Sequence, residues 1–327
     1  EIVRRYCEVA LKKGYKIDEL KADLENYVHG IELDDIECQK CIDNVSNVAK
    51  NFGIKSVKWD IICADALTVD KYNNRMDFVL GNPPYIRVHH LGNSIEAVKN
   101  FSFAKNGMID LYIVFYEVGL NMLNLSGVLG YITPSSFFNS LAGSYMRKQF
   151  VNNNYICKIV DLKHYQAFST STYSTIVILR KTRNSKEIEY YQFDKNTLTP
   201  YYVESLLPDD YFILDKFYFS KKQDLDFLKK IFFNSKHCDV LVKNGFATLC
   251  DDIFIDKFDF DSKYIIPVLK ASKGKWEKII YPYDKNGKLI PEDLLKRDIL
   301  LYDYLFSTKN YLLKRNSEYK DESHWYA

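Results

Sequence analysis

Two consecutive prolines, Pro83 and Pro84, follow directly after a short apolar run of the sequence. The run, residues 76–80, contains Met, Phe, Val and Leu and has the composition of a buried β-strand. Proline has no amide hydrogen and fixes its own φ angle, so the strand must end here in a rigid, non-helical turn. In an α/β sheet, ligands bind at the carboxyl ends of the strands. We therefore predict a ligand site at residues 81–85, which we call the corner.

The groups that the corner presents suit one kind of ligand. Asn82 offers a side-chain oxygen, Pro83 a backbone carbonyl and Tyr85 an aromatic face. A planar substrate with an exocyclic amino group could donate to both oxygens and stack on the ring. Two acceptors would also stabilise the positive charge that appears when the amino group attacks an electrophile. The alternative is a plain turn, because Asn-Pro often begins a turn.

Two acidic residues each follow another predicted strand. Glu32 follows a strand at residues 27–31, Asp65 ends a strand at residues 58–64, and a helix is predicted between them at residues 34–52. An acid at the end of the second strand of a nucleotide-binding sheet can accept hydrogen bonds from both ribose hydroxyls, which fits Glu32. The alternatives are a solvated cap for Glu32 and an Asx turn for Asp65. The alternation of strands and helices predicts an α/β fold with a parallel, doubly wound, Rossmann-like sheet.

The tetrapeptide Asn-Pro-Pro-Tyr at residues 82–85, preceded by Glu32 and Asp65, resembles the catalytic motif of gamma-class adenine-N6 DNA methyltransferases. In that class, which includes Type IIG restriction–modification proteins, cofactor motifs precede the catalytic motif and a target-recognition region follows. The resemblance implies a class I methyltransferase sheet, S-adenosyl-L-methionine as cofactor and double-stranded DNA as partner. Glutamine methyltransferases acting on protein release factors and some RNA adenine methyltransferases carry a similar tetrapeptide, so these substrates remain open.

The resemblance also implies roles for individual residues. The residues expected to hold the target amine and its ring are Asn82, Pro83, Pro84 and Tyr85. A second aromatic residue, from a later loop, would stack on the other face of an adenine that has left the duplex. Phe168 fits this place, with Tyr173 as the alternative, although Phe168 could instead be a core residue beneath its loop. The residues expected to bind the cofactor nucleoside are Glu32, Leu33, Asp65 and Ala66.

One motif of the family is missing from the beginning of the sequence. In the family, the first helix follows a glycine-rich loop that wraps the methionine part of the cofactor. Here helical periodicity starts at Ile2, and no Gly-x-Gly loop precedes Glu1. We therefore expect a chain that starts after this motif, which leaves open a DNA-binding or specificity fragment without catalysis. Type IIG chains also carry a nuclease domain; none is visible, so cleavage would need a restriction endonuclease module, fused or separate.

The second part of the chain differs in composition from the first. After about Asn184 the sequence is rich in Tyr, Phe, Asp and Lys and has little strand–helix periodicity. It loosely resembles the target-recognition region of Type IIG relatives, through a Tyr-Pro-Tyr strand at residues 281–283 and a late Trp-Tyr at residues 325–326. We expect a methyltransferase core at residues 1–185 and a mixed α+β recognition region, itself cut short, at residues 186–327.

Overall charge does not indicate a nucleic-acid partner. The 45 Lys and Arg residues nearly balance the 43 Asp and Glu residues, so any contact with DNA must come from a local patch. The candidates for contacts to the DNA backbone are Arg87, Lys270, Lys273, Lys275 and Lys278.

The cysteines and the hydropathy of the sequence indicate in which cellular compartment the protein is expected. The seven cysteines are scattered along a long chain, which predicts reduced thiols in a cytoplasm. Cys38 and Cys41 form a CxxC within a predicted helix, but no second pair follows, and a structural zinc site needs four ligands. We therefore expect no metal. No apolar run is long enough to span a bilayer, so we expect no membrane association.

Overall fold

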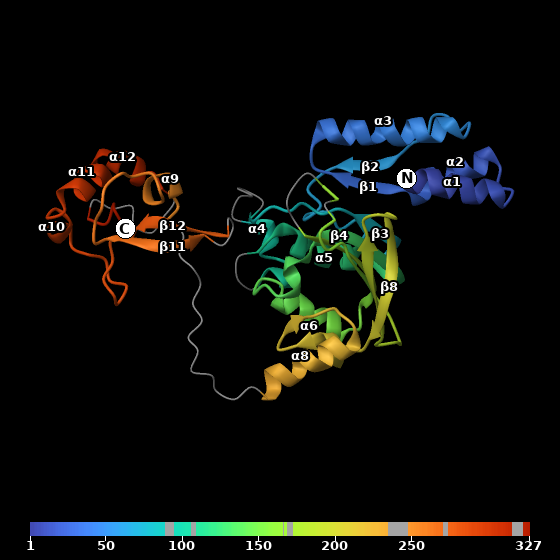
Figure 1. Cartoon of the computed structure of the whole chain (residues 1–327). Helices are drawn as coiled ribbons and strands as arrows, with labels where there is room; N and C mark the ends of the chain where they lie inside the picture. The colour runs from blue at the N-terminus through green and yellow to red at the C-terminus, as the bar shows by residue number, and fades with distance from the viewer. Residues whose placement is uncertain are drawn as a thin grey trace. The chain divides into compact units, whose positions relative to one another are not determined.

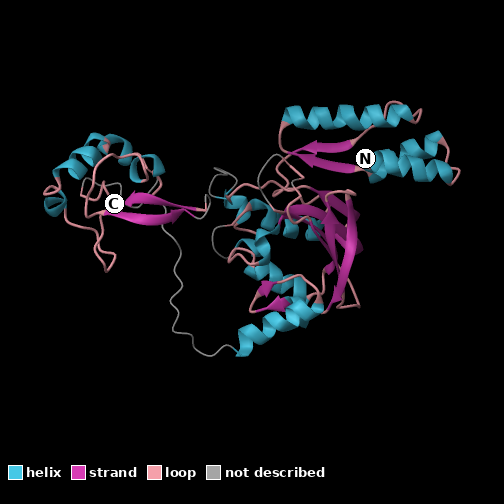
Figure 2. Cartoon of the chain, viewed as in Figure 1, coloured by secondary structure: helices cyan, strands magenta, loops and turns pink. Residues whose placement is uncertain are grey.

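The chain forms two compact units in a computed structural model, Glu1–His237 and Cys238–Ala327 (Figure 1). The structure describes residues 1–88, 95–105, 109–165, 167–168, 173–234, 248–270, 274–315 and 323–327. The first unit combines helices with a large sheet, and the second combines short helices with a two-stranded ribbon (Figure 2). Within these described ranges, no helix has both the length and the apolar character needed to cross a membrane.

Six described strands of the first unit form one mixed sheet. In spatial order they are β3 (Met76–Gly81), β4 (Leu123–Pro134), β6 (Ser174–Arg180), β5 (Ile156–Asp161), β7 (Ile188–Asp194) and β8 (Thr199–Leu206). β3 is parallel to β4 and β5 to β7, whereas β6 is antiparallel to β4 and β5, and β8 is antiparallel to β7. The predicted α/β fold is confirmed, but the expectation of a wholly parallel sheet is wrong. A parallel neighbour needs a crossover connection, usually a helix, and the described residues between β5 and β6 contain none.

The sheet continues past the boundary that composition suggested at residue 185. Ile188 and Tyr190 of β7 are buried in the same core as β4. The first unit is completed by α7 (Pro208–Tyr211), β9 (Phe212–Ile213), β10 (Lys216–Phe217) and α8 (Lys222–Asn234). The rise in Tyr and Phe after Asn184 therefore marks aromatic residues that join the first core, rather than the start of a new compact unit.

Helix α5 (Leu111–Met122) is buried over most of its surface and packs against β4. Gly119 permits the close approach, because a Cβ at this position would lie 2.3 Å from Cδ1 of Leu129. The buried hydroxyls of Tyr116 and Thr133 satisfy each other at this contact, with the two oxygens 2.8 Å apart. α5 therefore fixes the strands whose carboxyl ends form the site. The shorter helices around it are α4 (Ile95–Val98), η3 (Ser102–Ala104), η4 (Ser135–Phe138) and α6 (Ser144–Asn152).

The N-terminal part of the first unit forms a layer of its own. β1 (His29–Glu32) and β2 (Asp60–Cys63) are parallel, with Glu32 aligned to Cys63. The helices α1 (Ile2–Lys12), α2 (Ile17–Tyr27) and α3 (Asp35–Asn51) share a small apolar core beside this pair. The Asp34 carboxylate caps α3 by accepting hydrogen bonds from the first-turn amides, as an N-cap residue does. Ile31 and Ile62 connect the layer to the larger core, against which they pack.

The outer edges of β1 and β3 have no partner among the described residues. β1 pairs only with β2, and β3 pairs only with β4 along the sheet. Two large apolar side chains of β3 are exposed, Phe78 by 71% and Leu80 by 54%. A strand that is buried on both faces of a parallel sheet does not leave such side chains in water. Each edge can therefore accept one more parallel strand.

The second unit has its own core of aliphatic and aromatic side chains. Its elements are α9 (Asp251–Phe254), β11 (Ile265–Lys270), β12 (Lys275–Ile280), α10 (Glu292–Leu295), α11 (Ile299–Ser307) and α12 (Lys309–Leu312). The apolar run Ile253-Phe254-Ile255 predicts a short strand at residues 252–255, but these residues form α9 and its end, so this prediction is wrong. Trp325 is completely buried, and the Arg315 guanidinium donates to its carbonyl at 2.8 Å. This unit is thus an independent folded body of mixed α+β type.

Candidate active site

The corner lies at the mouth of the six-stranded sheet. Since β3, β4 and β5 run in one direction and β6 in the other, their carboxyl ends and the amino end of β6 share one edge. Among the described residues, no group forms a hydrogen bond with the Asn82 amide, which is exposed at this edge. Pro83 is buried and Pro84 half-buried, so the backbone beneath Asn82 is fixed. The corner thus presents the Asn82 oxygen to solvent and to any ligand at the edge.

Tyr85 is held in place at the base of the corner. Its hydroxyl donates to the carbonyl of Ile132 at 3.2 Å. Burial raises the pKa of Tyr85, while a hydrogen bond with Ser174 lowers it by a smaller amount, so the ring stays a neutral phenol at physiological pH. A neutral aromatic face is suited to stacking on a base.

The two rings that sequence predicted for the base lie next to each other. The centroids of Tyr85 and Phe168 are 6.3 Å apart, with planes at 82°. Phe168 is 37% exposed, so it is not a buried core residue. The contact is edge to face, and the rings would have to separate and turn to hold a base between parallel faces. Tyr173 is 59% exposed and contacts the His164 ring at 5.5 Å instead.

The residues predicted to bind the cofactor nucleoside lie together at the ends of β1 and β2. Glu32 Oε1 accepts hydrogen bonds from the amides of Leu33 and Asp34 at 2.8 and 3.2 Å. Asp65 Oδ1 accepts from the amide of Leu67 at 2.9 Å, which is an Asx turn. Both acids therefore perform the local capping that was the alternative interpretation. Each does so with one oxygen, and the second oxygen has no partner among the described residues.

Leu33 and Ala66 flank these acids. Leu33 is 68% exposed and offers an apolar surface beside Glu32, and Ala66 is half-buried. Next to them, Cys63 donates its thiol hydrogen to Asp35 Oδ1 at 2.7 Å. This hydrogen bond to a carboxylate, with a smaller contribution from burial, raises the pKa of Cys63 to about 11. The thiol therefore stays protonated and unreactive at this edge.

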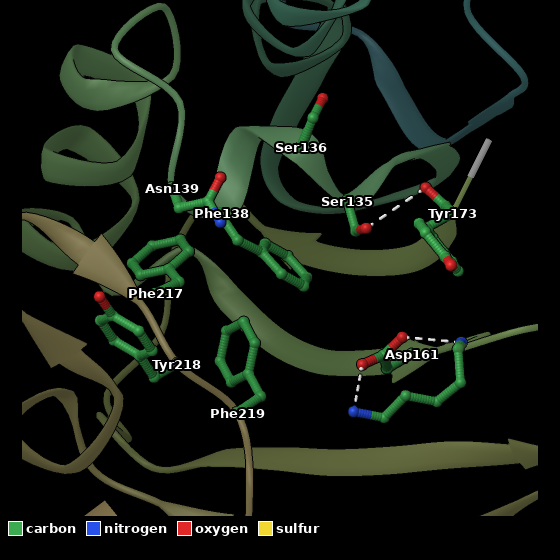
Figure 3. Close-up of a pocket in the computed structure, with 10 residues that line it drawn as sticks. Ser135, Ser136, Phe138, Asn139, Asp161, Tyr173, Phe217, Tyr218 and Phe219 are labelled. Atoms are coloured by element: carbon green, nitrogen blue, oxygen red, sulfur yellow. Dashed lines mark hydrogen bonds and ion pairs between the residues drawn. The ribbon is translucent and has the colours of Figure 1, made fainter. Parts of the chain in front are cut away.

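A cavity that sequence reasoning missed opens at the edge of the sheet where β4 and β5 end (Figure 3). Its volume is about 550 Å³. The side chains that line it come from the ends of β4 and β5, the start of β6 and the segment after β10: Ser135, Ser136, Phe138, Asn139, Asp161, Lys163, Tyr173, Phe217, Tyr218 and Phe219. We call it the aromatic cavity. No local pattern could reveal it, because Phe138 and Phe219 meet only in the folded chain, with centroids 4.9 Å apart.

The basic residues proposed for DNA contacts are separated between the two units. Arg87 is exposed next to the corner, where its backbone bridges to Asp110. In the second unit, three lysines lie on the β11–β12 ribbon near acids: Lys270 at 2.5 Å from Asp251, Lys275 at 3.5 Å from Glu277 and Lys278 at 3.8 Å from Asp261. Both side chains are exposed only in the Lys278 pair, and an exposed pair of this kind is weak and exchanges partners easily. Lys273 lies outside the described residues.

Comparison with known proteins identifies a family whose members resemble this chain in sequence. Residues 5–168, which contain the corner, both acids and Phe168, match the family described as Eco57I restriction-modification methylase. The chain is similar to the type II restriction enzyme and methyltransferase RM.Eco57I of Escherichia coli, with 25% identity over 79% of this chain and 31% of the relative. It is also similar to the type II methyltransferase M.BstVI of Geobacillus stearothermophilus, with 25% identity over 99% of this chain and 66% of the relative. The chain therefore spans less than two thirds of the length of either relative.

One solved structure resembles the chain as a whole in fold. The Type IIL restriction-modification enzyme MmeI in complex with DNA aligns with a TM-score of 0.56, covering 91% of this chain and 43% of that one. The sequence identity is 12%, so this likeness concerns the fold alone.

Proposed function

Because the chain belongs to the Eco57I restriction-modification methylase family, we propose that it transfers a methyl group to the N6 amine of adenine in double-stranded DNA. The observation that carries this proposal is the exposed Asn82 oxygen beside Tyr85 and Phe168, whose rings are 6.3 Å apart. A flat base with an amino group is the ligand that this combination fits. The gamma-class order of motifs, with Glu32 and Asp65 before Asn-Pro-Pro-Tyr, supports an adenine-specific enzyme of this kind.

The corner would act on the amine by hydrogen bonding. The Asn82 side-chain oxygen and the Pro83 carbonyl each accept one amine hydrogen, which leaves the nitrogen lone pair directed away from the ring. As the nitrogen gains positive charge, both hydrogen bonds strengthen, so the corner stabilises the transition state more than the ground state. The excess proton then passes to solvent at the open edge. Tyr85 and Phe168 hold the ring in place, and positioning contributes most of the rate.

S-adenosyl-L-methionine, when bound, would supply an electrophilic methyl group, whose bond to sulfur breaks as the bond to the amine forms, so that the electron pair stays on the sulfur of the departing neutral thioether. The chain fits this cofactor at the ends of β1 and β2. Glu32 and Asp65 each keep one carboxylate oxygen without a partner among the described residues, so they can accept from ribose hydroxyls and from an adenine amine. The exposed Leu33 side chain can pack on the adenine ring. We further propose that one more parallel strand, which carries the glycine-rich loop of the family, pairs with the free edges of β1 and β3.

The proposal is tested by supplying the purified protein with isotopically labelled S-adenosyl-L-methionine and three substrates: duplex DNA, RNA and a protein release factor. We expect the label in DNA, as N6-methyladenine identified by mass spectrometry of the digested nucleosides. Label in glutamine or in RNA alone would refute the proposal. If calorimetry shows no heat of cofactor binding and no label is transferred, the chain is a DNA-binding fragment without catalysis.

The role of Glu32 leads to a binding prediction. Glu32→Gln should weaken the affinity for S-adenosyl-L-methionine by about tenfold or more, because a hydrogen bond to a charged group contributes roughly 1.5–3 kcal/mol. Isothermal titration calorimetry measures the change. Glu37→Gln is the matched control, since Glu37 lies on α3 and pairs with Lys40 at 2.7 Å. Equal affinities for the Glu32 variant and the control would remove Glu32 from the cofactor site.

The β11–β12 ribbon leads to a prediction about DNA. Lys278→Gln should weaken DNA binding and reduce the slope of log K against log salt by about 1, as expected for one lost phosphate contact. The Lys278 side chain is 65% exposed, and its acid neighbour Asp261 is 98% exposed, so the ammonium is available. Fluorescence anisotropy at several salt concentrations gives the slope. Lys257→Gln, at a side chain 62% exposed in the same unit, is the control that should leave the slope unchanged.

A further inference from the structure

We propose that the aromatic cavity receives a second nucleobase of the bound DNA, displaced from the stack close to the adenine that is methylated. This inference rests on the proposed function, since it needs DNA at the open edge of the sheet. It assigns a ligand to a site separate from the corner, because neither Asn82 nor Tyr85 lines the cavity.

The position of the cavity places it within reach of the same DNA. It opens at the ends of β4 and β5, on the edge where β3 ends in the corner. One short chain of contacts joins the two sites: Ser136 Oγ is 3.0 Å from the Tyr112 hydroxyl, and the Tyr112 and Tyr85 rings are 6.3 Å apart. A duplex that delivers a base to the corner would therefore bring its neighbouring nucleotides to the cavity.

The walls of the cavity suit a flat aromatic ligand. Phe138 and Phe219 meet edge to face, with centroids 4.9 Å apart, and together form one aromatic surface of the cavity (Figure 3). Phe219 is rigidly supported, because it stacks on Tyr190 and Tyr211 at 5.6 and 5.3 Å with interplanar angles of 24° and 27°. A ring fixed in this way is a ready stacking platform, and stacking on an aromatic side chain tolerates any base.

The charges in the cavity favour a neutral base over a phosphate. Asp161 and Lys163 form an ion pair at 3.0 Å, and the Asp161 side chain is only 14% exposed. The pair cancels in net charge, so the cavity has no positive field that would attract a phosphate. It does present an acceptor beside a donor, which is the pattern needed to meet the edge of a base.

The volume of the cavity also limits the ligand. About 550 Å³ lies in the range of sites that enclose one small organic molecule, so a single nucleoside can enter but a stacked duplex cannot. The base must therefore leave the helix before it binds. Displacement of a base next to the target would be easiest where the target itself has already left the stack.

The test uses duplexes that carry 2-aminopurine, whose fluorescence is quenched inside the stack, at the target adenine or at one neighbouring position at a time. The site of methylation, read from methylated DNA of the host, fixes these positions. With the wild-type protein, we expect fluorescence to rise at the target and also at one neighbouring position. Phe219→Leu should abolish the second rise, keep the first and weaken DNA binding by about tenfold through the lost stacking contact.

Two further variants keep this test decisive. Phe138→Leu removes the ring that contacts Phe219 and should give the same result if Phe219→Leu fails to fold. Phe227→Leu changes a side chain that is 65% exposed on α8, outside the cavity, and should leave both rises intact.

If 2-aminopurine fluorescence rises at the target position alone, the proposal of a second displaced base is wrong, and the proposed methyltransferase function still stands. If both cavity variants fold but lose the fluorescence rise at the target and methyl transfer, the cavity is the site of the target base. This result would also overturn the proposal of a second displaced base. Absence of any rise and of any methyl transfer to DNA would refute both proposals together.

Discussion

Replacing Asn82 by alanine should lower the rate of methyl transfer about 10²–10³-fold, which is the usual cost of removing one preorganised hydrogen-bond partner from a developing charge. The affinity for S-adenosyl-L-methionine should not change, since the predicted cofactor residues lie at the ends of β1 and β2 rather than on β3. The fold should also persist, because the Asn82 side chain is exposed. Single-turnover kinetics with labelled cofactor, together with calorimetry, measure the two quantities.

Two further variants define the role of Asn82. Asn82→Asp keeps an oxygen acceptor at the same place and should retain part of the activity that Asn82→Ala loses. Asn51→Ala changes an exposed Asn at the end of α3 and should have no effect on rate. Near-normal turnover by Asn82→Ala would contradict the catalytic role of the corner. Equal loss in the aspartate variant, which keeps both the shape and the acceptor, would show that the amide NH2 group or the neutral charge of Asn82 is also required.

Replacing Arg147 by methionine should destabilise the first unit by about 3 kcal/mol or more, because buried carbonyls without partners cost roughly 1–3 kcal/mol each. Arg147 is only 2% exposed. Its guanidinium donates to the carbonyls of Asp215, Phe137 and Ser140 at 2.7, 2.6 and 2.8 Å. Methionine fills a similar space but satisfies none of them. The free energy of unfolding, measured by urea denaturation followed by circular dichroism, gives the size of the effect.

A neighbouring lysine provides the control for Arg147. Lys148 pairs with the Asp215 carboxylate at 2.8 Å, and its side chain is 48% exposed. Lys148→Met should therefore change the free energy of unfolding by less than about 1 kcal/mol, as is usual for an exposed ion pair. Arg147→Lys keeps the charge but loses the planar set of donors, so it should lie between the two. If Arg147→Met proves as stable as the control, the three hydrogen bonds do not support the fold in the way proposed.

Arg147 also has a place in the site. By joining the carbonyl of Phe137 to that of Asp215, it holds the segment before Phe138 against the β9–β10 hairpin that leads to Phe219. These two segments both line the aromatic cavity, where Phe138 and Phe219 meet. Loss of Arg147 should therefore loosen the cavity before it affects the corner, which β3 and β4 hold independently.

Sequence alone predicted the parts of the fold that depend on local pattern. Strand β3 and helix α3 were predicted to within one or two residues of their bounds, since an apolar run before Pro83 and an acidic N-cap at Asp34 are strong local signals. Glu32 was predicted directly after a strand and is the last residue of β1, and Asp65 follows the end of β2 by two residues, because each acid ends an apolar run. Their functional roles, like that of the corner, remain predictions.

The features that the sequence did not predict have a common physical cause, because they depend on contacts between residues far apart in the chain. The direction of β6 is set by its pairing with β4 and β5, and nothing in the β-branched run at residues 176–180 encodes a direction. The short helix α9 was predicted as a strand because four residues carry too little periodicity to separate the two. The aromatic cavity joins Phe138 to Phe219, which are far apart in sequence, so only the folded chain brings it into view.

The open side of β3 has a practical consequence for anyone who handles this polypeptide. Its outer backbone groups, with Phe78 and Leu80 in water, form a surface on which a strand from another molecule can add. Unprotected edges of this kind are where proteins aggregate. Yield and solubility at high concentration will therefore be limited by this single strand rather than by the well-packed core beneath it.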